Sequence, residues 1–152
     1  YKDIADNLVA GAKAEIEAVG GTWDIVEVPG ALEVPTAISM ADKLSNFDGY
    51  VALGCVIRGA TTHYETVCND SSRAITLLGL EGLSIGNGIL TVENMDQAVE
   101  RADPAQMNKG AGAAIAALRL VELDRKYAPP TPVGDPRDDI IMAGTPGAKD
   151  IA

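Results

Sequence analysis

The chain has 152 residues, a mass of 15.8 kDa and a formal net charge of −10, with 47% hydrophobic and 22% charged residues. This length suits one compact domain, and the acidic balance argues against nucleic acid and anionic membranes as partners. No apolar run approaches the ~20 residues of a membrane span. Two cysteines and one histidine cannot form a zinc finger or a disulfide scaffold. We therefore expect a cytoplasmic protein with reduced cysteines.

Helical and strand periodicities alternate along the chain. They predict helices over 3–19, 33–44, 62–80, 95–102 and 108–127, and strands over 23–28, 50–57 and 83–92. The near-continuous apolar run 50–57 is typical of a strand covered on both faces. This order predicts an α/β fold, a three-layer α/β/α sandwich with a parallel, flavodoxin-like sheet. Three strands are few and a helix comes first, so we expect that the first strand is missing from this chain.

The composition changes near residue 128. Residues 1–127 form the expected domain, and residues 128–152 are rich in proline and glycine, which predicts an extended tail without a core of its own. One apolar patch, 140–142, offers a less favoured alternative, in which it adds a strand to the sheet edge.

Ligands of open parallel sheets bind beyond the carboxyl ends of the strands, so the loops there are candidate sites. In the first such loop, Pro29 and Pro35 bracket Gly30 and Glu33. Glu33 opens the next helix, and it either accepts hydrogen bonds from substrate hydroxyls or is a first-turn charge stabilised by the helix dipole.

The second loop follows the apolar strand and combines Gly59, Thr61 and Thr62 with His63, the only histidine. Backbone N–H groups, a helix N-terminus and threonine hydroxyls predict a site for an anion such as phosphate. His63 could act there as general acid and base, although a lone histidine is more often structural.

The third loop, 101–109, carries Arg101 and Lys109 on either side of Pro104. Two cations in an acidic chain favour binding of a phosphorylated substrate, with solvated surface charge as the alternative. Nucleotide-driven phosphoryl transfer is disfavoured, because no complete dinucleotide or phosphate-loop glycine motif is present. Both cysteines are expected to be small core residues, and the small-residue helix 110–118 favours close contact with other helices, including an oligomer contact.

The combined motifs resemble the 6,7-dimethyl-8-ribityllumazine synthase family. The matching segments are 28–35, 54–69, 88–94 and 108–110, in order and spacing, and the most specific part is the Arg-Gly-x-Thr-x-His motif at 58–63. The resemblance covers about residues 1–127. It implies condensation of 5-amino-6-(D-ribitylamino)uracil with 3,4-dihydroxy-2-butanone 4-phosphate, with release of phosphate and water and without metal or organic cofactor.

The resemblance also implies roles for individual residues. His63 would shuttle protons, Arg101 would pair with the phosphate, and Lys109 would lie near the ribityl and phosphate region. The substrate-binding residues would be Ala31, Leu32 and Glu33 for the ribityl chain, Val56 and Ile57 for the pyrimidine ring, and Gly59, Ala60, Thr61 and Thr62 for the phosphate. Asn87, Gly88, Arg101 and Lys109 would come from the neighbouring subunit, which implies a homopentamer with shared active sites.

Two alternatives to this transferase stay open at the level of sequence. One is a catalytically weak relative that binds flavin or lumazine as a carrier or scaffold. The other is a flavodoxin-like binding or signalling domain, for which the fold gives only an analogy.

Overall fold

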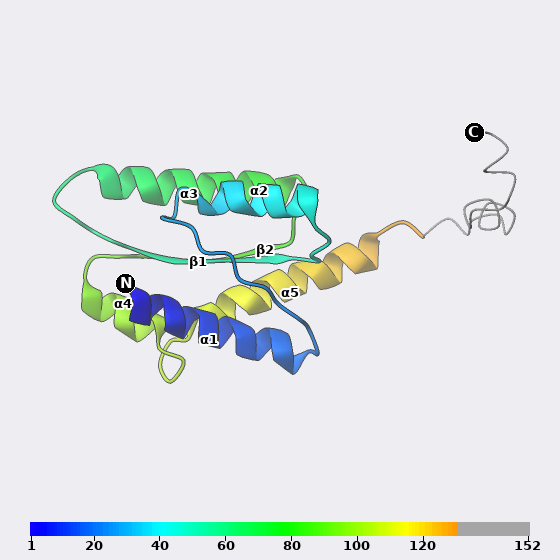
Figure 1. Cartoon of the computed structure of the whole chain (residues 1–152), viewed down its shortest axis with the longest axis horizontal. Helices are drawn as coiled ribbons and strands as arrows, with labels where there is room; N and C mark the ends of the chain where they lie inside the picture. Colours follow the sequence, from blue (N-terminus) through cyan, green and yellow to red (C-terminus); the bar gives the residue numbers. More distant parts are fainter. Residues whose placement is uncertain (131–152) are drawn as a thin grey trace, which may run out of the picture.

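The computed structural model describes residues 1–130 and shows a parallel sheet between two layers of helices (Figure 1). The elements in chain order are α1 (Lys2–Ala18), α2 (Val34–Leu44), β1 (Tyr50–Ile57), α3 (His63–Leu80), β2 (Ile85–Val92), α4 (Met95–Ala102) and α5 (Lys109–Tyr127). Helices α2 and α3 cover one face of the sheet, and α1, α4 and α5 cover the other. The predicted three-layer α/β arrangement is therefore confirmed.

Strands β1 and β2 pair in parallel, with Tyr50 opposite Ile85 at one end and Ile57 opposite Val92 at the other. Two apolar clusters sandwich them. On one side, Leu8 of α1 packs with β2 and α4; on the other, Ile75 of α3 packs with α2 and both strands. Because β1 contributes side chains to both clusters, its sequence is apolar along nearly its whole length.

Seven of the eight predicted elements are confirmed, with ends that differ by two residues at most. The predicted strand over 23–28 is wrong: no strand forms there, and β1 pairs with β2 alone among residues 1–130. Alternating apolar residues become a strand only where a neighbouring strand supplies hydrogen bonds. Here Ile25 and Val26 remain 44% and 70% exposed.

Trp23, the only tryptophan, is held by α1 instead of by a strand. Its indole Nε1 donates a hydrogen bond of 2.9 Å to Glu17 Oε1, and Lys13 Nζ lies 3.8 Å from the ring centroid, a cation–π contact. Local attachment to a helix thus replaces the predicted pairing.

Helix α5 packs through its small residues, as its composition predicts. Gly110 lies against the backbone of Leu8 in α1, and Gly86 of β2 lies against the backbone of Ala113. This face is therefore used within the chain, and the expected oligomer contact of α5 stays a prediction.

Residues 131–152 lie outside the described part of the chain, and with them the predicted strand-forming patch 140–142 and most of the predicted tail. Within residues 1–130, none of the helices combines the length and apolarity that crossing a lipid bilayer would require.

Candidate functional site

The loop after β1, residues 58–62, leads directly into α3. The ladder between the strands extends one residue beyond β1, since Arg58 N donates to Val92 O at 2.9 Å. Thr62 is the N-cap residue but makes no side-chain cap, and Thr61 Oγ1 accepts only a long hydrogen bond, 3.4 Å, from His63 N. First-turn N–H groups have no partner within a helix, so they remain available to an anion here. We call residues 58–62 the threonine loop.

His63 is the first residue of α3 and is exposed. Within residues 1–130 its imidazole makes no hydrogen bond to another protein group. The side chain therefore lies exposed next to the threonine loop.

The loop before α2 holds the predicted residues Ala31, Leu32 and Glu33 together. A turn forms in which Glu33 N donates to Gly30 O at 3.2 Å, and Glu33 becomes the N-cap of α2 without capping it through its side chain. Its carboxylate is exposed, and Leu32 is 38% exposed.

The predicted ring-binding residues Val56 and Ile57 end β1 but belong to opposite faces, as successive strand residues do. Ile57 packs against the cluster that contains Leu8 and Val92. By this alternation Val56 faces the other side of the sheet, the side that α2 and α3 cover.

Four predicted residues gather in an open groove of about 470 Å³ along β2. Its lining consists of residues 87–91, Arg101, Lys109, Gly112, Ala113 and Ala116, which include the predicted Asn87 and Gly88. The groove carries two cations, and we call it the cation groove. None of its lining residues comes from the loops before α2 or after β1.

Two cations of the groove are placed by the connection between α4 and α5. Arg101 is in the last turn of α4, and Lys109 is the first residue of α5. Asp103 accepts from Ala105 N at 2.8 Å and from Gln106 Nε2 at 2.9 Å, and these bonds, with that of Gln106 the larger cause, lower the pKa of its carboxyl. Asn108 then adopts a left-handed conformation, φ 46° and ψ 53°, and caps α5.

One cluster at the site was not assigned a role from the sequence: Arg58 with Glu65 and Glu93. Arg58 Nε donates to Glu93 Oε2 at 2.7 Å, its Nη1 pairs with Glu65, and its guanidinium carbon lies 4.2 Å from the centroid of the Tyr64 ring. Hydrogen bonds to the two carboxylates raise the pKa of Arg58, and Arg58 lowers the pKa of Glu65.

A signal for this cluster is present in the sequence. Arg58 and Glu93 each directly follow a predicted parallel strand, and such strand ends meet at one edge of the sheet. Glu65 follows within the first turn of the next helix. Joining these three positions would have predicted the ion pairs.

The Arg58–Glu65 pair should make stability depend on pH. The folded-state pKa of Glu65 is lowered, so the pair contributes stability above the ordinary glutamate value, about 4.3, and loses it as pH falls through the lower folded value. We expect the difference in thermal midpoint between wild type and Glu65→Gln at pH 7 to disappear in strong acid. When Arg58→Gln is already present, adding Glu65→Gln should change the thermal midpoint by the same amount at pH 7 and in strong acid. If the midpoint difference still depended on pH as it does with Arg58 intact, the pairing would be contradicted.

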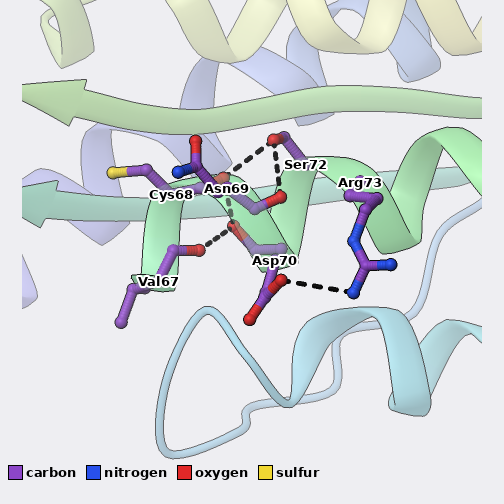
Figure 2. A network of polar contacts seen from close by, with 7 residues as sticks. Val67, Cys68, Asn69, Asp70, Ser72 and Arg73 are labelled. Atoms are coloured by element: carbon purple, nitrogen blue, oxygen red, sulfur yellow. Dashed lines mark hydrogen bonds and ion pairs between the residues drawn. The ribbon is translucent and has the colours of Figure 1, made fainter. Parts of the chain in front are cut away.

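Farther along α3, two serine hydroxyl groups donate to backbone carbonyls of the same helix and one ion pair joins two of its side chains (Figure 2). Ser71 Oγ donates to Val67 O at 2.6 Å, Ser72 Oγ donates to Cys68 O at 2.8 Å, and Arg73 pairs with Asp70 at 3.3 Å. These groups therefore bond within their own helix.

Other groups in the described part of the chain offer less chemistry. Residues 1–130 hold no cluster of three His, Cys, Asp or Glu side chains suited to a metal ion. Cys55 and Cys68 are half-buried free thiols, and burial raises the pKa of Cys55. A hollow of about 250 Å³ at the other end of the sheet contains none of the predicted site residues.

Comparison with known proteins adds a family to this geometry. A family model described as 6,7-dimethyl-8-ribityllumazine synthase matches residues 1–125. The chain is similar to proteins of that name from Jannaschia sp., 56% identical over 130 residues (86% of this chain and 73% of the relative), and from Erythrobacter litoralis, 53% identical over 127 residues (84% and 91%). A protein of the same name from Agrobacterium fabrum is 52% identical over 132 residues (83% and 89%).

Proposed function

Because this chain belongs to the 6,7-dimethyl-8-ribityllumazine synthase family, we propose where its two substrates bind and which residues act on them. The chain is a transferase of riboflavin biosynthesis. It condenses 5-amino-6-(D-ribitylamino)uracil with 3,4-dihydroxy-2-butanone 4-phosphate to give 6,7-dimethyl-8-ribityllumazine, and it releases phosphate and water.

The phosphorylated ketone binds with its phosphate at the threonine loop, on Gly59, Ala60, Thr61 and Thr62. The support is chemical: the N-cap residue Thr62 makes no side-chain cap to α3, and the one side-chain bond to a first-turn N–H, from His63 N to Thr61 Oγ1, is long at 3.4 Å. A phosphate dianion gains both hydrogen bonds and the favourable end of the helix dipole there. His63, next in the chain, is the general acid and base for Schiff-base formation and for departure of the phosphate.

The pyrimidine binds beside the same loop. Ala31, Leu32 and Glu33 contact the ribityl chain, for which the exposed Glu33 carboxylate offers two acceptor oxygens to hydroxyl groups. Val56 contacts the ring from the α3 side of the sheet, and Ile57, whose side chain packs in the core, contributes its backbone.

The cation groove completes the site of a neighbouring copy, with Arg101 at the phosphate, Lys109 near the ribityl chain and the phosphate, and Asn87 and Gly88 at the ring. The observation that carries this proposal is the division of the charges: Arg101 and Lys109 belong to α4 and α5, on the opposite side of the sheet from α3 and His63. We propose a homopentamer, with a solution mass about five times the 15.8 kDa of one chain.

Mixed oligomers test this division. His63→Ala and Arg101→Ala chains, each of low activity alone, are expected to regain activity when co-expressed with different affinity tags and purified through both. In a ring with one interface per site, about a quarter of the sites would then combine an intact His63 with an intact Arg101. No recovery in a doubly tagged oligomer of unchanged mass would show that both residues serve the site of their own chain.

Arg101→Ala tests the role of the groove in phosphate binding. Loss of a charge-assisted hydrogen bond should raise KM for the phosphorylated ketone about tenfold or more, while KM for the pyrimidine changes less than about twofold, because the lost partner carries no pyrimidine contact. Steady-state kinetics with each substrate varied in turn measure both. Arg101→Lys keeps the charge, so its KM for the phosphorylated ketone should lie between those of wild type and Arg101→Ala. An equal rise in KM for both substrates would contradict a role of Arg101 in phosphate binding.

We place the enzyme in the cytoplasm. Cys55 and Cys68 are free thiols, and free thiols persist in reducing compartments.

A further inference from the structure

The cluster of Arg58, Glu65 and Glu93 stands at the edge of the proposed phosphate site without an assigned role. Resting on the proposed function, we infer that Arg58 is a positioning residue: it holds the first turn of α3, and with it His63, against the carboxyl ends of β1 and β2, and it balances two carboxylates that would otherwise repel the phosphate.

The contacts of Arg58 join three elements at one point. Its backbone N–H extends the strand ladder to Val92 O at 2.9 Å, its Nε donates to Glu93 just after β2 at 2.7 Å, and its Nη1 pairs with Glu65 in the first turn of α3. The Tyr64 ring lies against its guanidinium, 4.2 Å from the guanidinium carbon. We call these contacts of Arg58 the arginine clamp. Because His63 immediately precedes Tyr64 in the chain, the clamp also holds the backbone that carries the imidazole.

The geometry requires arginine rather than any cation. A guanidinium presents a rigid fork of N–H groups that can serve two carboxylates while stacking on a ring, whereas lysine is a point charge without that geometry. Arg58→Lys should therefore keep the positive charge of the cluster but no longer hold Glu65, Glu93 and the first turn of α3 in the same geometry.

The charge of the cluster affects the anion directly. Glu65 and Glu93 with Arg58 sum to one negative charge, and without Arg58 they sum to two, beside a loop that is proposed to bind phosphate. Both carboxylates are about half exposed, so solvent weakens this repulsion without removing it.

The proposal predicts a split between KM and kcat. Arg58→Gln should raise KM for the phosphorylated ketone about three- to tenfold through charge and lower kcat about tenfold or more through misplacement of His63. Arg58→Lys should keep KM within about threefold of wild type and still lose kcat. Arg73→Gln, which breaks the Arg73–Asp70 pair on the same helix, is the matched control and should leave both constants unchanged.

A spectroscopic readout follows from the single histidine. The imidazole resonances of His63 are the only histidine signals in an NMR spectrum of this chain, and they should shift or broaden in both Arg58 variants but not in Arg73→Gln. Competition by inorganic phosphate should weaken in Arg58→Gln and return when Glu65→Gln and Glu93→Gln are added, while kcat stays low.

Several outcomes would overturn the inference. The first is a kcat for both Arg58→Gln and Arg58→Lys that equals the kcat of Arg73→Gln. The second is an Arg58 variant whose kcat is lowered while its His63 resonances match those of wild type. If Arg58→Gln does not fold, the kcat and resonances of Arg58→Lys decide the question alone. Failure of the proposed function itself is separate, because it would appear as full activity of His63→Ala.

Discussion

Replacing His63 with alanine should lower kcat by about 10²- to 10⁴-fold, the range that a positioned acid and base contributes. Formation of a Schiff base and departure of phosphate both require proton transfers, and His63 carries the only imidazole of the threonine loop and the first turn of α3. The rate is followed by the absorbance of the lumazine product with both substrates saturating. KM values should change little, because binding of the phosphate depends on other groups.

The exposure of His63 supplies the control for this measurement. The side chain is exposed and makes no hydrogen bond to another protein group within residues 1–130, so His63→Ala should unfold at the wild-type temperature. Added imidazole should restore part of the lost rate by replacing the missing base. A variant that turns over as fast as wild type would remove His63 from the mechanism and leave orientation of the two substrates as the source of catalysis.

Gly110→Ala should lower the free energy of unfolding by about 3 kcal/mol, at the upper end of the range for overpacking. A Cβ at this position would overlap the carbonyl group of Leu8, which is backbone and cannot rotate away. Helices α1 and α5 would have to separate along their contact. Thermal unfolding followed by far-ultraviolet circular dichroism should show a midpoint lowered by roughly 10 °C.

Gly79→Ala is the matched control, since Gly79 is also helical and a Cβ there meets no atom within 4 Å. Alanine has the higher helix propensity, so this variant should be equal to wild type or more stable by about 0.5–1 kcal/mol. Equal midpoints for the two variants would mean that α1 and α5 are not in close contact in solution.

Most of the fold could be predicted from the sequence because burial dictates its patterns. The apolar run of β1 and the apolar spacing of α1 follow from covered faces, and those elements begin and end within two residues of the prediction. The strand over 23–28 was wrong for a different reason. Its pattern states which side chains could be buried, whereas a strand also needs a hydrogen-bonding neighbour, which no local pattern specifies.

The candidate site could be predicted in its parts and less in its assembly. Glycine, threonine and histidine after a buried strand indicate an anion site with a proton carrier nearby, and His63 does stand exposed there. Arg101 and Lys109 stand out in the sequence as cations of an acidic chain, and they line one groove. The clamp of Arg58 required knowing which strand ends meet, which is a property of the sheet rather than of any segment.

Family membership decides against one of the alternatives that the sequence left open. It identifies the chain as a transferase that forms 6,7-dimethyl-8-ribityllumazine, in place of a flavodoxin-like signalling domain. The individual roles of His63, Arg101 and Lys109 remain predictions, for which the substitutions above are the tests.

The attachment of Trp23 to α1 determines what intrinsic fluorescence can report on this protein. The sole indole is 42% exposed and bonded to Glu17, beneath the ammonium of Lys13, so its emission senses whether the segment after α1 stays attached. During heating, emission is expected to change at a lower temperature than ellipticity does, because that segment lacks strand pairing and opens locally. Fluorescence alone would therefore underestimate the temperature at which the sheet and its helices unfold.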